Sequence, residues 1–217
     1  MEKFLKRKVT RRQFLKEACV FCLGLAAASF TDFFGRKSAQ AKEDALYLHE
    51  ARFYDKIDEN TVQCKLCPRG CTLSEGQRSF CRVREPHEGK LYSLVYGSPC
   101  AIHVDPIEKK PLFHFLPGTP IFSIATAGCN YRCKFCQNWS ISQSAPEELE
   151  SYELSPQEVV SEAVRNGCPS IAYTYTEPSV FYEYMVDTAR IAKARGVRNM
   201  YHSNGSLNPD AVRELSM

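Results

Sequence analysis

The alternation of strand-like and helix-like segments after residue 119 constrains the fold of this chain more than any other feature. Three short segments rich in apolar and aromatic residues are the expected strands, at residues 121–126, 170–176 and 198–202. Strands that alternate with helices predict a parallel sheet with right-handed crossovers. About three βα units of roughly 30 residues each fit after residue 119, fewer than a closed barrel needs. We therefore expect an α/β fold, a partial barrel whose further strands would lie beyond residue 217 of a longer protein.

Local signals mark the ends of the expected helices. Residues 155–158, Ser-Pro-Gln-Glu, combine an N-cap serine, a proline at the first helical position and a glutamate at the third, which is a capping box. Gly167 ends this helix. A longer helix is expected over residues 179–195, ended by Gly196, and Asn208-Pro209 opens a last helix.

The charge of the chain is unevenly distributed. The formal net charge is +3, but residues 42–217 hold 19 basic and 22 acidic side chains. A nucleic-acid-binding protein should show a basic stripe in its body, and none is visible here. We therefore expect no nucleic-acid partner, and we assign the basic surplus of residues 1–41 to targeting.

Residues 1–41 have the three parts of a twin-arginine signal peptide. Residues 10–16 contain paired arginines, residues 18–30 form an apolar run, and residues 39–41, Ala-Gln-Ala, give a cleavage site. The apolar run is too short for a membrane span, which needs about 20 residues. This interpretation predicts an exported or membrane-associated protein. The alternative is an amphipathic helix with adjacent arginines by chance, in a cytoplasmic protein.

The spacing Cys129-x3-Cys133-x2-Cys136 follows the first expected strand directly. Three thiolates can bind three irons of a 4Fe–4S cluster and leave the fourth iron open for chemistry. In α/β barrels, the C-terminal end of a strand is where active sites lie. The alternatives are a chance cluster or a zinc site, for which Cys168 could supply a fourth ligand.

This cysteine loop resembles the signature C-x3-C-x-aromatic-C of the radical S-adenosylmethionine (SAM) superfamily, with Phe135 as the aromatic residue, and the resemblance implies that Phe135 contacts a cofactor. Residues 105–118, 128–130 and 136–139 more closely resemble the radical SAM member of the AmmeMemoRadiSam system, which is similar to pyruvate formate-lyase activating enzymes. The resemblance covers about residues 60–217. It implies a partial radical SAM (β/α)6 barrel over residues 119–217, a 4Fe–4S cluster on the three cysteines, and SAM as a second cofactor. In such enzymes, reductive cleavage of SAM gives a 5′-deoxyadenosyl radical that abstracts a hydrogen atom.

The resemblance also implies SAM contacts. Residues 175–178, Tyr-Thr-Glu-Pro, stand where activating enzymes have Gly-Gly-Glu-Pro, so Glu177 is expected to hold the SAM amino group. Asn204 matches an Asp-Thr-Asn-Gly motif near the SAM ribose and carboxylate, although His202 replaces its aspartate. Ordinary readings of the same residues are a helix N-terminal acid and an Asn-Gly turn. Trp139, the only tryptophan, is expected to pack against the first helix.

A second cysteine group lies in residues 42–118, interpreted as a small cysteine-rich module and a connecting segment. It comprises Cys64, Cys67, Cys71 and Cys81. Four thiolates at this spacing suit a structural zinc ion, a second iron–sulfur cluster or, in an exported protein, disulfides.

Two functions are compatible with the sequence. The first is a radical SAM oxidoreductase that acts on a small molecule or a protein, for example a glycyl-radical enzyme, with a flavodoxin- or ferredoxin-like electron donor and possible Memo-like and AMMECR-like partners. The second is an exported, non-catalytic electron carrier or metal-binding module. Lys109 and Lys110 could meet a carboxylate or phosphate of a substrate, but we expect a solvated pair. His103 and His114 receive no role.

Overall fold

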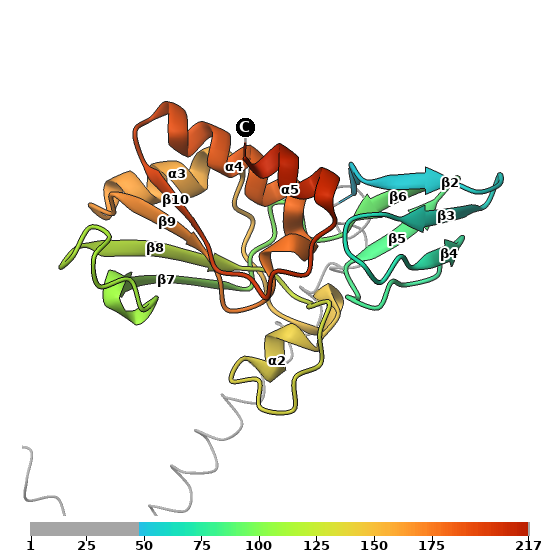
Figure 1. Ribbon diagram of the computed structural model, residues 1–217, viewed down its shortest axis with the longest axis horizontal. Helices are drawn as coiled ribbons and strands as arrows, with labels where there is room; N and C mark the ends of the chain where they lie inside the picture. The colour runs from blue at the N-terminus through green and yellow to red at the C-terminus, as the bar shows by residue number, and fades with distance from the viewer. Residues whose placement is uncertain (1–47, 217) are drawn as a thin grey trace, which may run out of the picture. The chain divides into compact units, whose positions relative to one another are not determined.

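The computed structural model describes residues 48–216, so the predicted signal peptide lies outside the described residues. The first part of the described chain forms two small antiparallel sheets (Figure 1). One sheet has the strand order β1-β6-β5, with β1 at His49–Glu50, β5 at Arg84–His87 and β6 at Lys90–Ser93. The other has the order β2-β3-β4, with β2 at Tyr54–Lys56, β3 at Thr61–Cys64 and β4 at Thr72–Ser74. The second cysteine group lies on and between these short strands.

The main sheet has four strands in the order β10-β9-β8-β7. The strands are β7 at Ala101–Pro106, β8 at Pro120–Ala125, β9 at Ser170–Tyr173 and β10 at Arg198–Tyr201. The last three strands are parallel, as the sequence predicts, but β9 stops at Tyr173 instead of Thr176. The first strand, β7, pairs antiparallel with β8. The predicted boundary at residue 118 is therefore wrong for this sheet, because its edge strand comes from the segment interpreted as a connection.

The α-helices of the described chain are α2 at Trp139–Ser142, α3 at Pro156–Arg165, α4 at Tyr182–Ala194 and α5 at Pro209–Leu215, with short 3₁₀ turns η2 at Ile107–Lys109, η3 at Pro146–Glu148 and η4 at Pro178–Phe181. Helices α3 and α5 begin where the local signals predict. The capping box of α3 is formed, since the Ser155 side chain accepts from the Glu158 N–H and the Glu158 carboxylate accepts from the Ser155 N–H. The expected helix over residues 179–195 is split into η4 and α4.

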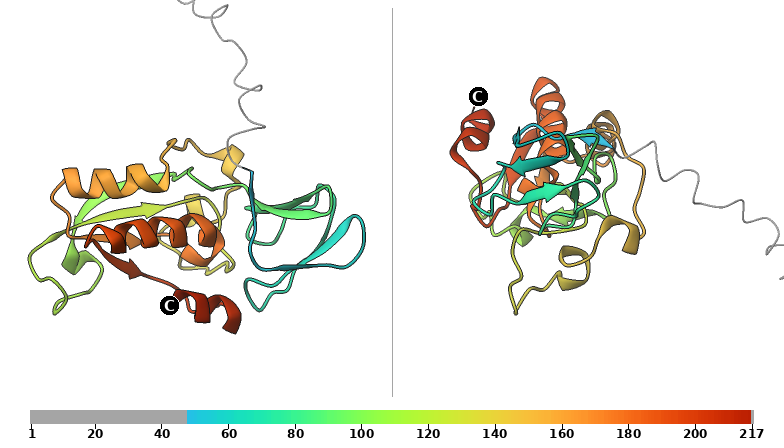
Figure 2. Two further views of the ribbon diagram at one scale, coloured as in Figure 1. Left: turned by 90° about the horizontal axis from the view of Figure 1, so that it is seen from above. Right: turned by 90° about the vertical axis from the view of Figure 1, so that its right-hand side faces the viewer.

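The two faces of the main sheet have different surroundings. Helices α3 and α4 lie along one face (Figures 1 and 2), where Phe122, Ile124 and Ile171 join the principal core. Because successive strand residues point to opposite faces, Ile121 and Ala172 reach the other face and form a second, smaller core with Ile107. No helix in residues 48–216 is long and apolar enough to cross a membrane.

A buried ion pair ties the small β1-β6-β5 sheet to helix α4. The guanidinium of Arg84 donates to both carboxylate oxygens of Glu183, at 3.2 and 2.7 Å, and both side chains are essentially inaccessible to solvent. The backbone N–H of Arg52 donates a third hydrogen bond to this carboxylate at 3.0 Å. Burial opposes ionisation, but Arg84 outweighs it and lowers the pKa of Glu183.

Candidate active site

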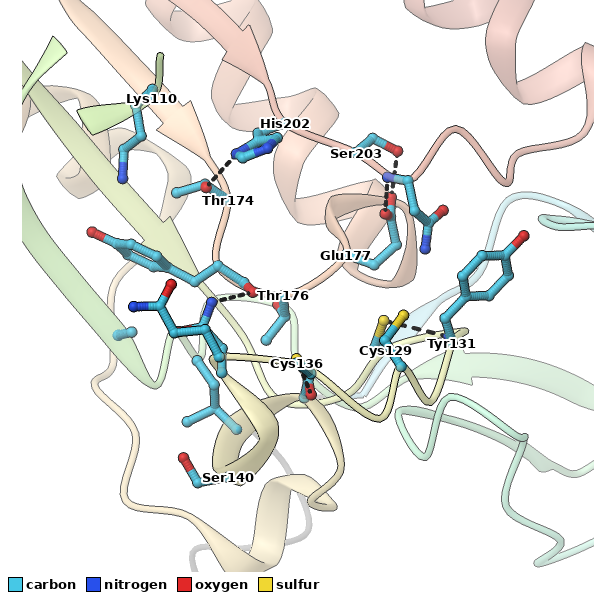
Figure 3. A pocket seen from close by; sticks show the side chains of 18 of the residues that line it. Lys110, Cys129, Tyr131, Cys136, Ser140, Thr174, Thr176, Glu177, His202 and Ser203 are labelled. Atoms are coloured by element: carbon cyan, nitrogen blue, oxygen red, sulfur yellow. Dashed lines mark hydrogen bonds between the residues drawn. The ribbon is translucent and has the colours of Figure 1, made fainter. Parts of the chain in front are cut away.

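A cavity of about 820 Å³ lies at the C-terminal ends of β9 and β10 and extends along β7 (Figure 3). Three groups of residues line it. The first is the cysteine loop that follows β8, together with the adjoining helix α2. The second comprises the residues after β9 and β10, including Thr174–Glu177 and His202–Asn204. The third comprises Ala101, His103, Lys109 and Lys110, on and just after β7. The C-terminal ends of the parallel strands and the antiparallel β7 therefore build one site together.

The cysteines Cys129, Cys133 and Cys136 all line this cavity, as the sequence predicts for a shared site. Gly128 sets the path of the loop with φ +87°, and a Cβ at this position would lie 2.3 Å from the carbonyl oxygen of Cys81. The loop is held further by the Gly128 N–H, which donates to the Ile141 carbonyl at 2.9 Å. The cysteine loop thus runs directly against the backbone of the second cysteine group.

The donor set of the loop fits an iron–sulfur cluster. Burial raises the pKa of the Cys129 thiol to about 11, and bound metal would reverse that effect by stabilising the thiolate. Within residues 48–216, no three His, Cys, Asp or Glu side chains are spaced closely enough to hold a metal ion as they stand. The fit rests on three thiols of one loop that line one cavity.

Two aromatic residues in and after the cysteine loop are exposed to solvent. Phe135, predicted to contact the cofactor, is 91% exposed. Trp139, predicted to pack, is 50% exposed at the start of α2. Neither side chain lines the cavity as it stands.

Glu177 is buried at the edge of the cavity and is held by several donors. Its Oε1 accepts from the N–H and hydroxyl of Ser179, at 3.1 and 2.9 Å, and from the Ser203 hydroxyl at 2.7 Å. Its Oε2 accepts from the Asn204 N–H at 2.7 Å. Within the described chain Oε2 has this single donor, so it retains capacity to accept from a ligand. Glu177 also caps η4, so the ordinary reading as a helix N-terminal acid holds as well.

Asn204 lies beside Glu177 and is fixed from two sides. Its side-chain amide donates to Asn130 Oδ1 at 2.9 Å, and its own oxygen accepts from the Ser206 N–H at 2.9 Å. Asn130 is buried next to Cys129 and also donates to the Ser206 carbonyl at 3.1 Å. The loop after β10 is therefore bonded directly to the cysteine loop. His202, where an aspartate was expected, lines the cavity and hydrogen-bonds Thr174 Oγ1 through Nδ1 at 3.2 Å.

A polar cluster on the β7 side was missed by sequence reasoning. Asp105 accepts from Lys109 and from Lys110, both at 2.7 Å, and from the Tyr175 hydroxyl. Lys110 is 5% exposed, so the expected solvated pair is wrong for this residue. Burial opposes ionisation of Asp105, yet hydrogen bonds from the lysines and Tyr175 hold its pKa well below the usual range. The four-residue spacing of Asp105 and Lys109 was the available signal, but Tyr175 is 70 residues away from Asp105.

The second cysteine group comprises Cys64, Cys67, Cys71 and Cys81, and the structure forms no disulfide among the cysteines of residues 48–216. Burial raises the pKa of Cys64 to about 11. Arg69, within this group, stacks its guanidinium 3.4 Å from the Phe80 ring centroid and also donates to the Asn130 carbonyl at 2.5 Å. The group is thus fastened to the cysteine loop by side chains as well as by close backbone contact.

A mostly parallel α/β sheet with three loop cysteines and a buried glutamate around one cavity is an arrangement typical of enzymes that hold a cofactor at the C-terminal ends of the strands. Comparison with known families points to one such class: the model of the radical SAM superfamily matches residues 123–216 of this chain. That family implies a 4Fe–4S cluster, SAM and radical chemistry.

Two curated relatives are known from Methanocaldococcus jannaschii. The chain is 49% identical to Uncharacterized protein MJ0808 over 168 residues, which are 77% of this chain and 50% of that protein. It is 35% identical to Uncharacterized protein MJ0674 over 81 residues, which are 37% of this chain and 19% of that protein. The chain thus spans about half the length of the first relative and a smaller part of the second. No solved structure matches it.

Proposed function

We propose that the protein is a radical SAM oxidoreductase whose 4Fe–4S cluster is bound by Cys129, Cys133 and Cys136. One observation carries the proposal: the three cysteines and Glu177 line the same cavity, although they lie on different elements. When bound, the cluster and SAM supply reductive cleavage of the sulfonium and a 5′-deoxyadenosyl radical for hydrogen abstraction. The protein's own part is to place the two cofactors and to exclude water from them.

The protein groups near the cysteines suit the polar end of SAM. The free acceptor capacity of Glu177 Oε2 can take a charge-assisted hydrogen bond from an ammonium group. Asn204, fixed by Asn130, can contact the ribose or carboxylate. For Phe135 we retain a cofactor contact as a prediction that requires a local movement of the loop, since this side chain now faces solvent.

Several finer assignments belong to the same proposal. The chain is proposed to be part of a (β/α)6 barrel similar to the AmmeMemoRadiSam radical SAM protein and to activating enzymes. Its proposed electron donor is flavodoxin- or ferredoxin-like. Its proposed partners are Memo-like and AMMECR-like proteins or a glycyl-radical enzyme. Its proposed location is outside the cytoplasm, reached by the twin-arginine route. The rival function is a non-catalytic iron–sulfur electron carrier.

For Cys64, Cys67, Cys71 and Cys81 we propose a structural zinc ion. Four free cysteines within 18 residues provide the usual number of ligands for closed zinc sites. Cys64 and Cys81 are buried, which suits a structural role more than exchange with solvent.

Electron paramagnetic resonance of the anaerobically reconstituted, dithionite-reduced protein tests the principal proposal. We expect a 4Fe–4S signal that changes when SAM is added. In Glu177→Gln, which keeps the shape but removes the charge, the change should require about tenfold more SAM. Glu153→Gln, an exposed position, is the matched control and should titrate as the native protein does.

The other outcomes are decisive. A normal 4Fe–4S signal that ignores SAM would favour the electron carrier. Folded protein that takes up no such cluster would refute the assignment of the three cysteines. The cluster signal of Glu177→Gln itself reports whether that variant keeps the loop folded.

A further inference from the structure

The β7 side of the cavity carries a cluster that the proposed cofactors do not use. We call it the Lys110 wall, comprising His103, Asp105, Lys109, Lys110 and Tyr175. Its members other than Asp105 line the cavity directly, and Asp105 lies behind them and joins them. Figure 3 shows Lys110 well apart from Cys129, with Glu177 on the side of Cys129.

The wall has an excess of positive charge. Lys109 and Lys110 share one carboxylate, that of Asp105, and no other carboxylate in residues 48–216 forms an ion pair with either lysine. The other acid that lines the cavity, Glu177, is bonded to Ser179, Ser203 and Asn204 near the cysteines. Within the wall, two lysines stand against one carboxylate. The wall therefore presents a net charge of +1 when His103 and Tyr175 are neutral.

Lys110 keeps unused hydrogen-bond donors at the cavity. An ammonium group has three N–H donors, and within the described chain Lys110 spends one of them, on Asp105. The ammonium lies 4.1 Å from the centroid of the Tyr175 ring, which supports it as a cation–π partner. A buried cation with free donors on a cavity wall is matched by an anion from outside the chain.

Tyr175 joins the members of the wall from a strained backbone conformation. Its φ is +63°, in the left-handed region that residues with a Cβ seldom adopt. From this backbone conformation the Tyr175 hydroxyl donates to Asp105, and the ring forms a T-shaped pair with His103. The carbonyl of Tyr175 accepts from Asn138 Nδ2 at 2.8 Å, which joins the wall to the segment that follows the cysteine loop.

We propose that the Lys110 wall binds a carboxylate or phosphate group of a small-molecule substrate that occupies the cavity together with SAM. The inference rests on the proposed function, because that function places the charged groups of SAM at the cysteines and Glu177, away from the wall. Ligand cavities measure roughly 300–1,000 Å³, and the volume of this one, about 820 Å³, lies in the upper part of that range. A glycine residue of a partner protein has no charged side chain for the lysines to bind.

Titration calorimetry with two probes tests this inference on the reconstituted full chain, with and without SAM. The probes are inorganic phosphate and malonate, with chloride as the only other anion. We expect at least one probe to bind, and Lys110→Met to weaken its affinity about tenfold or more. Asp105→Asn should have the opposite effect and tighten binding, because it removes the negative charge that the two lysines share. Lys193→Met, at an exposed position on α4, is the matched control and should bind as the native protein does.

The results separate this inference from the function on which it rests. If neither probe binds, if Lys110→Met binds as tightly as the native protein, or if Asp105→Asn does not bind more tightly, the inference is overturned, whatever SAM does to the cluster signal. If the signal ignores SAM while the anion effects follow the expected order, the function fails and the anion site stands. Preference for phosphate or for malonate identifies the chemical group, and Asp105→Asn keeps the inference testable if Lys110→Met does not fold.

Discussion

Replacing Gly128 by alanine tests how the cysteine loop is positioned. The added Cβ would lie 2.3 Å from the Cys81 carbonyl oxygen and 2.6 Å from Val83 Cγ1. The first contact is with backbone and cannot be relieved by a rotamer change, so either the loop or the segment just before β5 must move. The φ of +87° adds conformational strain of about 1–2 kcal/mol for any residue with a Cβ.

Gly167→Ala is the matched control, because Gly167 also has a positive φ, +66°, but a Cβ there meets nothing within 4 Å. The loss of unfolded-state entropy is the same for both substitutions and cancels in the comparison. Overpacking of a tight contact costs about 1–3 kcal/mol. We therefore expect the free energy of unfolding of Gly128→Ala to fall below that of Gly167→Ala by about this amount.

Urea denaturation measures the difference in stability, and iron per chain after reconstitution measures the effect on the loop. Gly128→Ala should take up less iron than the native protein, while Gly167→Ala should take up the native amount. Equal stability of the two variants within about 0.5 kcal/mol, together with equal iron, would refute the view that close contact with Cys81 positions the loop.

Three further outcomes are expected. Glu183→Gln leaves Arg84 buried without its counter-charge, so thermal unfolding should show a loss of about 3–5 kcal/mol, and a loss under about 1 kcal/mol would contradict the pairing. The pKa of Glu183 is lowered in the folded state, so the pair contributes stability above the carboxyl's ordinary pKa of 4.5. This contribution should vanish as the pH falls through the lowered pKa. Glu183→Gln should not show that loss. Cys133→Ala should lose the cluster by iron analysis, whereas Cys168→Ala, at a buried position outside the cavity, should keep it, and equal iron in both would contradict the ligand assignment.

The local features of this fold were predictable from the sequence. The capping box of α3 forms at Ser155 as expected, because its signals lie within four residues of one another. The three parallel strands lie within three residues of their predicted ends. The common cavity of Cys129, Cys133 and Cys136 also follows from their position directly after a strand. In each case, the residues that determine the local structure lie within a short stretch of the chain.

The features that depend on distant pairs were not predictable. The pairing of β7 with β8 fixes which residues of β7 face the cavity, and a slip of one residue would reverse the face. A lysine is expected at the surface when only its neighbours in the sequence are known. Lys110 is buried beside Asp105, which also bonds Tyr175 after strand β9, and this distant contact is not visible in the sequence. Tyr175 in place of a glycine was visible as a departure, but the sequence did not show where its ring would lie.

That departure explains how β7 becomes part of the site. A glycine at position 175 could adopt the same backbone conformation without strain, but it would offer no hydroxyl to Asp105 and no ring to Lys110. Tyrosine has a strained φ at this position, but its hydroxyl joins the segment after β9 to Asp105 on β7. Residues that persist in such conformations are held there by their surroundings, and they concentrate at functional sites. The strained φ of Tyr175 and the burial of Lys110 are therefore linked, because the Tyr175 side chain contacts both Asp105 and Lys110 in the Lys110 wall.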